Sequence, residues 1–137
     1  MKKRILCVML TVALLCSLTG HTYAAIAEPG IQPLYQYAAD AYATLQINGT
    51  TATGTAVLDG FAGTTTKVNV VMTLQKKGLW WSNASDSFNY TTYGHDANLE
   101  LNYDSLSSGT YRIKAVFTVY SGTASETITA YSPEARV

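Results

Sequence analysis

The strongest constraint on the fold of this chain is an alternation of apolar and polar side chains with a period of two residues. It is clearest over residues 66–75, where the apolar members are Val68, Val70, Met72 and Leu74. The polar members between them include Lys67, Asn69, Thr73 and Gln75. Successive side chains on a β-strand point to opposite faces, so this pattern predicts a strand with one buried and one solvated face.

Further segments with the same alternation follow one another and are separated by turn residues. They cover residues 41–47, 51–58, 79–84, 97–103, 111–119 and 126–131, and the weakly patterned residues 85–94 lie among them. Asn48-Gly49 and Asp59-Gly60 are typical turn pairs between strands. About seven short strands at spacings of roughly 8 to 12 residues predict an all-β sandwich or barrel rather than a βαβ fold.

One local motif favours the sandwich over the barrel. Tyr111 opens the longest of the later strands, directly after a loop that contains Gly109. Immunoglobulin-like sandwiches carry a tyrosine at this corner, and its hydroxyl binds the backbone across the turn. We therefore expect an immunoglobulin-like, antiparallel two-sheet sandwich with Tyr111 in a tyrosine corner.

The N-terminal residues have the layout of a secretory signal peptide. A basic cluster over residues 2–4 precedes an apolar run over residues 5–18, and small residues follow it. A transmembrane helix needs about 20 apolar residues, so this run is too short for an anchor. We expect cleavage after Ala27, with Ala24 as the second possibility, and a secreted, extracellular product without a membrane span.

Cleavage changes the composition of the chain. Both cysteines, Cys7 and Cys16, leave with residues 1–27, so the mature chain contains no thiol and no disulfide. The basic total falls from nine to six while all nine acidic residues remain, which gives a net charge of −3. A mildly acidic protein argues against a nucleic-acid partner, which usually requires a basic face.

The mature chain has the length of one domain. Removing 27 of the 137 residues leaves 110, enough for an adequate core without disulfides. Residues 28–36 contain Pro29, Gly30 and Pro33 and are expected to form a flexible leader. The immunoglobulin-like domain is then predicted to cover residues 37–137.

Several strand and turn motifs resemble those of a known group of exported proteins. The motifs are residues 72–78 (MTLQKKG) followed by Trp80-Trp81, residues 108–114 (SGTYRIK), residues 119–122 (VYSG) and residues 125–127 (SET). Together they resemble an uncharacterised family of small secreted β-sandwich proteins from Gram-positive bacteria, mostly Firmicutes. This resemblance implies an extracellular or wall-associated β-domain and supplies no catalytic residue that carries over to this sequence.

Candidate catalytic residues are few. His95 is the only histidine after position 27, and its neighbour Asp96 would point the opposite way on a regular strand, so we expect no base and orienter pair. Carboxylates that a glycoside hydrolase needs are present at Asp59, Asp86, Asp96, Glu100, Asp104 and Glu126. Most of them lie at expected turns or on solvent faces, and the neighbouring sequence singles out none as catalytic. We therefore expect no enzyme activity and no cofactor, with a small glycoside hydrolase as the least favoured alternative.

A calcium site is a weak candidate. Asp96, Asn98 and Glu100 alternate along one predicted strand and offer the oxygen ligands that calcium prefers. Same-face residues lie about 6.8 Å apart along a strand, too far for shared coordination without a bulge or a neighbouring loop. A solvated polar face is therefore the favoured interpretation.

Aromatic side chains offer the most distinctive candidate surface. Trp80, Trp81, Tyr90 and Tyr93 fall in the least regular region, where exposed rings would suit sugar binding. On a strand, one of the two tryptophans is expected to face the core and the other solvent. The alternative is that these rings only cover an open edge of the core.

A second surface follows from the parity of the strands. Its expected members are Val71, Val116, Tyr120 and Tyr131 together with Lys67, Lys114, Thr118, Thr127 and Thr129. Contiguous apolar area on an outer face can mark a partner site, although strands prefer such residues in any case. Two functions remain open: a secreted non-catalytic interaction or structural module that meets a protein or the cell envelope, and a carbohydrate-binding module that uses the four aromatics for an envelope glycan.

Overall fold

The computed structural model describes residues 34–137, and the predicted signal peptide and most of the expected leader lie outside them. The described part contains strands and loops. In chain order the strands are β1 (Ala38–Asn48), β2 (Thr51–Gly60), β3 (Lys67–Lys77), β4 (Trp81–Asn83), β5 (Phe88–Thr92), β6 (Asp96–Tyr103), β7 (Thr110–Ser121), β8 (Ala124–Tyr131) and β9 (Ala135–Arg136). The weakly patterned residues 85–94 thus contain a strand, β5, that the alternation did not define.

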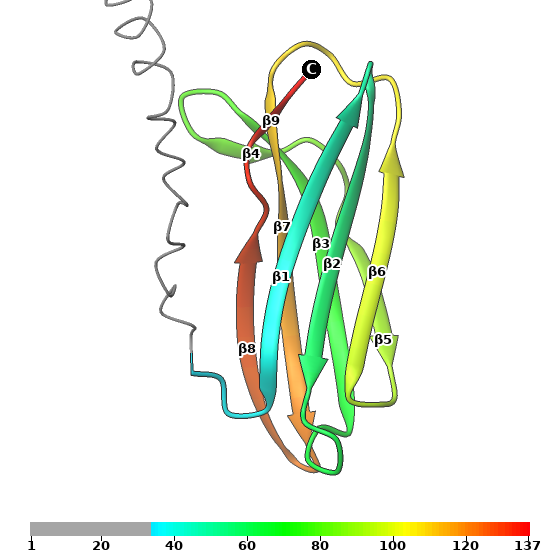
Figure 1. The fold of residues 1–137 in the computed structure, drawn as a ribbon. Coiled ribbons are helices and arrows are strands. Elements are labelled where there is room, and N and C mark those ends of the chain that lie inside the picture. The colour runs from blue at the N-terminus through cyan, green and yellow to red at the C-terminus, as the bar shows by residue number, and fades with distance from the viewer. Residues whose placement is uncertain (1–33) are drawn as a thin grey trace, which may run out of the picture. The chain divides into compact units, whose positions relative to one another are not determined.

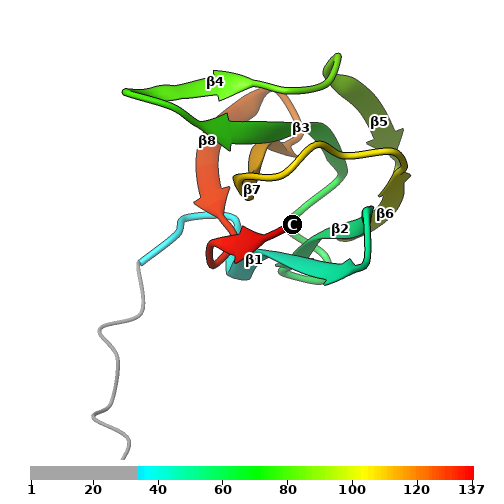
Figure 2. The same cartoon turned by 90° about the horizontal axis from the view of Figure 1, so that it is seen from above.

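The strands form two antiparallel sheets that pack face to face (Figures 1 and 2). The first sheet has the order β1-β2-β6, and the second has the order β4-β3-β7-β8, with β5 beside β3 and β9 beside β7. The chain crosses to the second sheet at β3, returns at β6 and crosses again at β7. This architecture confirms the predicted all-β, immunoglobulin-like two-sheet sandwich.

The core lies between the sheets and is built from the rows that the alternation predicted. Val68, Val70, Met72 and Leu74 of β3 are all fully buried. Opposite them in register on β7 are Val119, Phe117, Ala115 and Ile113, which are also fully buried. The first sheet contributes alanines and leucines, including Ala56 and Leu58 of β2 and Ala97 and Leu99 of β6.

Two glycines are required by local geometry. Gly49 has a φ of 62° in the tight β1–β2 hairpin, where Asn48 pairs with Thr51. That conformation suits glycine in a hairpin turn, as the Asn48-Gly49 signal predicted. Gly60 ends β2 against the backbone of the residue that precedes β6, and a Cβ at this position would collide with the carbonyl oxygen of His95.

The tyrosine corner is present where the sequence placed it. Tyr111 is buried, and its hydroxyl donates a hydrogen bond of 2.7 Å to the carbonyl oxygen of Ser107. The end of the chain closes over the same loop, because the backbones of Val137 and Gly109 exchange two hydrogen bonds of 3.0 and 3.2 Å. The corner therefore joins β7, its preceding loop and β9 into one unit.

The first described residues are fastened to the sandwich before β1 begins. The Glu126 carboxylate of β8 accepts hydrogen bonds from the backbone amides of Gln36 and Tyr37. Tyr35 and Tyr37 pack against the core. The end of the expected leader thus contacts the domain, and the predicted domain start at residue 37 falls one residue before β1.

Candidate functional site

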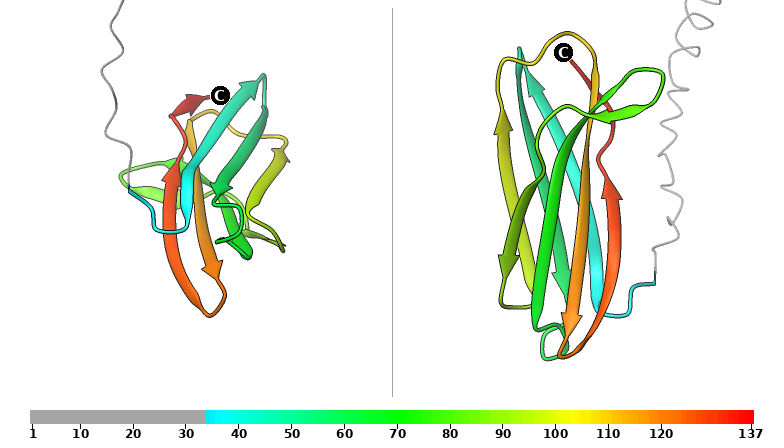
Figure 3. Two further views of the ribbon diagram at one scale, coloured as in Figure 1. Left: turned by 60° about the horizontal axis from the view of Figure 1, so that its bottom comes forward. Right: turned by 180° about the vertical axis from the view of Figure 1, so that it is seen from behind.

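The hairpin between β3 and β4 lies across the outer face of the second sheet. The sequence predicted a strand over residues 79–84, whereas β4 is limited to Trp81–Asn83 and pairs with the last residues of β3. Seen from behind, the hairpin passes in front of β7 toward the edge formed by β8 and β9 (Figure 3). The contacts of Trp81 and Lys77 fasten it there.

Arg112 of β7 is the centre of these contacts. Its guanidinium carbon lies 4.1 Å from the ring centroid of Trp81 and 4.1 Å from that of Tyr131 on β8. We call Trp81, Arg112 and Tyr131 the arginine stack. Cation–π contacts of this kind are attractive, most of all with tryptophan. The stack thus links β4 and β8 across the intervening β7.

Polar contacts extend the arginine stack in both directions. Arg112 Nε donates to Gln75 Oε1 at 2.9 Å, and Gln75 Nε2 donates to Asn83 Oδ1 at 3.2 Å. Lys77 Nζ forms an ion pair with Glu134 at 3.0 Å, with both side chains half exposed. The outer face at this end of β3 is therefore covered by its own side chains.

The β3–β4 hairpin and the residues after it bury two side chains that the alternation predicted to be solvent-exposed. Thr73 and Gln75 do lie on the outer face, but only 5% and 8% of their surface is exposed. The hydroxyl of Thr73 lies 2.7 Å from that of Ser87, and Gln75 lies beneath the hairpin. The expectation of solvated side chains was wrong here because chain segments that follow β3 fold back over it.

The tip of the hairpin presents two apolar side chains to solvent. Leu79 is 96% exposed and Trp80 is 84% exposed. We call Leu79 and Trp80 the hairpin tip. The prediction that one tryptophan faces the core was wrong for both rings: Trp80 precedes β4 in the turn, and Trp81 is half-buried against Arg112 on the outer face.

The other two candidate aromatics lie at the opposite end of the sandwich. Tyr93 is 86% exposed in the turn between β5 and β6, and Tyr90 of β5 is partly exposed beside Val70. That turn lies at the other end of the sandwich from the β3–β4 hairpin (Figure 1). Trp81 pairs with Lys77, whereas the end of β5 pairs with Val68, nine positions earlier on β3. Nine residues of strand span about 30 Å. The four predicted rings are therefore split into two separate pairs.

The predicted outer patch of the second sheet is confirmed by the register. Val71 pairs with Val116, which pairs with Thr129, and Thr118 pairs with Thr127 in the next row. Lys114 pairs with Tyr131 on β8. At the far end, Lys67 Nζ lies 3.8 Å from the ring centroid of Tyr120.

Charge is divided between the two sheets. Within residues 34–137 the six basic residues are Lys67, Lys76 and Lys77 on β3, Arg112 and Lys114 on β7, and Arg136 on β9. The charged residues of the first sheet and its connecting loop are Asp40, Asp59, Asp96, Glu100 and Asp104. The second sheet and its loops also carry Asp86, Glu126 and Glu134, so six basic residues there accompany three acidic ones. One sheet is thus acidic and the other has an excess of basic residues, which the net charge of the chain does not reveal.

The acidic sheet contains a row of three aspartates. Asp40 pairs with Asp59, and Asp59 pairs with Asp96 on the next strand. His95 Nε2 lies 3.1 Å from Asp96 Oδ2, so the expectation that these neighbours cannot meet was wrong. His95 precedes β6, and in a turn two successive side chains can converge, whereas on a strand they diverge.

The calcium candidates occupy the exposed face of β6. Asp96, Asn98 and Glu100 pair in register with Asp59, Val57 and Thr55 of β2. Among the residues that the structure describes, no group of three histidine, cysteine, aspartate or glutamate side chains is arranged to hold a metal ion. In the same part of the chain, no helix is long and apolar enough to cross a membrane.

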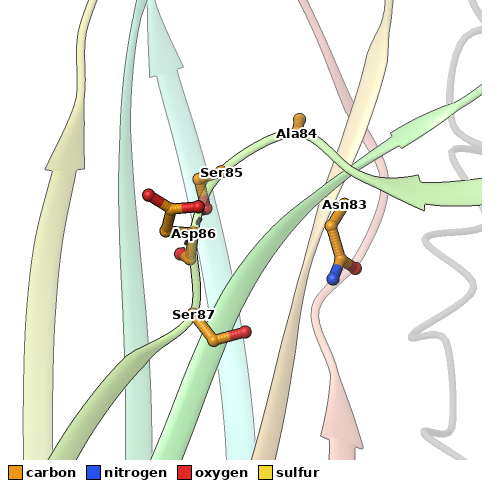
Figure 4. A pocket seen from close by; sticks show the side chains of 5 residues that line it. All are labelled: Asn83, Ala84, Ser85, Asp86 and Ser87. Atoms are coloured by element: carbon orange, nitrogen blue, oxygen red, sulfur yellow. Dashed lines mark hydrogen bonds between the residues drawn. The ribbon is translucent and has the colours of Figure 1, made fainter.

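A shallow, polar pocket of about 630 Å³ lies where the chain passes from β4 to β5 (Figure 4). Its lining residues are Asn83, Ala84, Ser85, Asp86 and Ser87. The Ser85 hydroxyl accepts a hydrogen bond of 3.2 Å from the amide of Leu74, so the pocket wall is tied to β3. Asp86 is the one carboxylate of this lining, which gives no carboxylate pair for glycoside hydrolysis.

Tyr103 lies at the end of β6 and packs against the core. Its hydroxyl is buried and has no hydrogen-bond partner among the described residues. Burial raises the pKa of Tyr103, and the nearby Ser85 side chain offsets part of that increase. Sequence reasoning missed this group because Tyr103 was simply the last member of an inward row.

Comparisons with known proteins assign the chain to no family. No family model and no curated protein matches the chain. A crystal structure of wild-type OgpA from Akkermansia muciniphila is similar with a TM-score of 0.38 and 14% identity, over 78% of this chain and 32% of that protein. The chain therefore spans less than half of that protein, and a likeness of this degree carries no functional argument.

Proposed function

We propose that this protein is a secreted, non-catalytic interaction module of the bacterial exterior that attaches to its partner through the hairpin tip. The observation that carries this proposal is the exposure of Leu79 and Trp80, at 96% and 84%. A soluble domain normally buries such side chains, and exposed apolar groups often mark interaction sites. Tryptophan is also enriched among the residues that dominate binding energy.

The anchoring of the hairpin supports a binding role. The arginine stack and the Lys77–Glu134 ion pair hold the hairpin on both sides of its tip. A fixed hairpin loses less conformational freedom on binding than a free loop does, which favours affinity. Leu79 and Trp80 are therefore held in one position before a partner binds.

A carbohydrate-binding module is supported less well. The four candidate aromatics are divided between two ends of the sandwich, so they form no continuous platform for one sugar chain. In addition, Arg112 already stacks on the ring of Trp81. Trp80 alone remains a freely exposed tryptophan at this end.

Substitution of the hairpin tip tests the proposal. The chain from Glu28 onward, with Trp80→Ser or Tyr93→Ser, is sedimented with cell-envelope fragments of a Gram-positive bacterium that contain wall and membrane. Tyr93 is the matched control because it is equally exposed, at 86%, at the other end. Trp80→Ser should weaken binding at least about tenfold, as expected of a hot-spot aromatic. Equal losses in both variants, or no loss in either, would contradict the proposal.

A further inference from the structure

The geometry points to the surface of an anionic lipid bilayer as the partner, contacted by the hairpin tip and the basic residues around it. This inference rests on the proposed function and names the chemistry of its partner. Two independent observations support it: the exposed apolar tip and the separation of charge between the two sheets. The domain would lie on the bilayer as a peripheral protein.

The hairpin tip has the composition of a membrane-interface anchor. Tryptophan prefers the boundary between headgroups and acyl chains, where its apolar ring and polar N–H are both satisfied. Leu79 is almost fully exposed beside it, and a bilayer supplies the apolar environment that this side chain lacks. Leucine offers no flat ring for a sugar, so this pair fits a lipid surface better than a glycan.

Basic residues surround the base of the hairpin. Lys77 ends β3, Arg112 and Lys114 lie on the outer face of β7, and Arg136 lies on β9 beside Thr110. Glu134 pairs with Lys77, and Asp86 lies in the connection from β4 to β5, so these four basic residues accompany two acidic ones and positive charge remains in excess at this end of the sheet. Basic residues near an anionic membrane each strengthen its binding, and the attraction fades within a Debye length.

The acidic sheet gives the contact a direction. Asp40, Asp59 and Asp96 form one row on the opposite outer face, where β1, β2 and β6 contain no lysine or arginine among the described residues. An anionic surface repels this face and attracts the other one. The charge division therefore turns the domain so that the hairpin tip meets the bilayer first.

The test measures binding of the chain from Glu28 onward to vesicles, which removes the apolar run of residues 5–18. Vesicles of phosphatidylcholine with phosphatidylglycerol are compared with vesicles of phosphatidylcholine alone, and soluble polyphosphate serves as an anionic polymer without a bilayer. Binding is followed by sedimentation and by the tryptophan emission maximum. We expect a shift to shorter wavelength with the anionic vesicles only, and weaker binding as salt is raised.

Variants separate the two parts of the contact. The double change Leu79→Ser with Trp80→Ser should abolish the emission shift and weaken vesicle binding more than tenfold. Lys114→Gln should weaken binding about fivefold, the effect of one charge near an anionic surface. Glu100→Gln on the acidic sheet and Tyr93→Ser at the far turn are the controls, and both should bind within about twofold of the parent, because neither residue lies near the hairpin.

Three results would overturn the inference. Equal binding to neutral and anionic vesicles would remove the role of charge. Binding to polyphosphate that matches vesicle binding and ignores the double change would identify an anionic polymer instead. Absence of vesicle binding, with envelope binding that still depends on Trp80, would reject the bilayer and leave the proposed function intact.

Discussion

The two outer faces of the sandwich share one backbone pattern and differ in chemistry. On the first sheet, Asp40, Asp59 and Asp96 meet in one cross-strand row. On the second sheet, Arg112 is flanked by two rings and bonded to Gln75. The aspartates of the first face repel one another, whereas the side chains of the second face attract one another. Alternation decides which residues point outward, and their identity decides whether a face adds to stability.

The largest effect is expected at the centre of the basic face. Arg112→Ala should lower the free energy of unfolding by about 2 kcal/mol, because it removes the stack and leaves the amide oxygen of the buried Gln75 without its donor. Urea denaturation measures the change. Arg112→Lys should recover only part of it, since lysine lacks the planar guanidinium. A loss below about 0.5 kcal/mol would mean that the stack is a surface contact of little weight.

The next largest effect is expected at Tyr103, which ends β6 and packs against the core. Tyr103→Phe should leave the domain equally stable or raise its free energy of unfolding by up to about 1 kcal/mol, because it removes a buried hydroxyl that has no hydrogen-bond partner within residues 34–137. The raised pKa means that the folded protein keeps this proton to higher pH than the unfolded chain. Stability from this group is therefore complete below the ordinary value of 10.0 and falls as pH rises further.

A pH series distinguishes this mechanism from simple packing. The difference in unfolding free energy between Tyr103→Phe and the parent should increase above pH 10, in favour of the variant. A difference that stays constant with pH would show that ionisation of Tyr103 does not affect folding.

The acidic row predicts a smaller gain. Asp59→Asn should raise the free energy of unfolding by about 0.5 kcal/mol at low salt, because like charges directly opposite on a sheet are destabilising. Salt screens exposed charges, so the gain should shrink as ionic strength increases. Thermal denaturation at two salt concentrations measures both. Thr55→Ser, on the same face of β2, is the control, and a gain that persists at high salt would contradict repulsion as its cause.

The smallest effect is expected for the ion pair at the base of the hairpin. Glu134→Gln should change the free energy of unfolding by less than about 0.5 kcal/mol, because both partners are half exposed. Urea denaturation at low salt is the measurement. A loss comparable to that of Arg112→Ala would show that Lys77, rather than the arginine stack, holds the hairpin.

The features that the sequence predicted depend on local pattern. The inward rows of β3 and β7, the hairpin at Gly49 and the tyrosine corner at Tyr111 all follow from the spacing of neighbouring residues. The pairing of Val71 with Val116 was also predictable, because strand parity and an immunoglobulin-like order fix which side chains share an outer face. Periodicity carries this information because each strand repeats every two residues.

The features that the sequence did not predict depend on contacts between distant segments. Trp81 meets Arg112 only because the hairpin crosses β7, and nothing near position 81 announces a partner 31 positions later. The pairing of His95 with Asp96 required knowledge of where β6 begins. The acidic and basic sheets were concealed because a net charge adds together residues that the fold separates.

The separation of acidic and basic residues onto different sheets affects how the protein adsorbs to a charged surface. A bead or a column matrix contacts one side of a molecule at a time and responds to the charge on that side. A domain with net charge −3 after loss of residues 1–27 would be expected to flow past a cation exchanger at neutral pH. With Lys114 and Arg136 on one sheet and Asp59 and Glu100 on the other, it should be retained by both cation and anion exchangers at low salt.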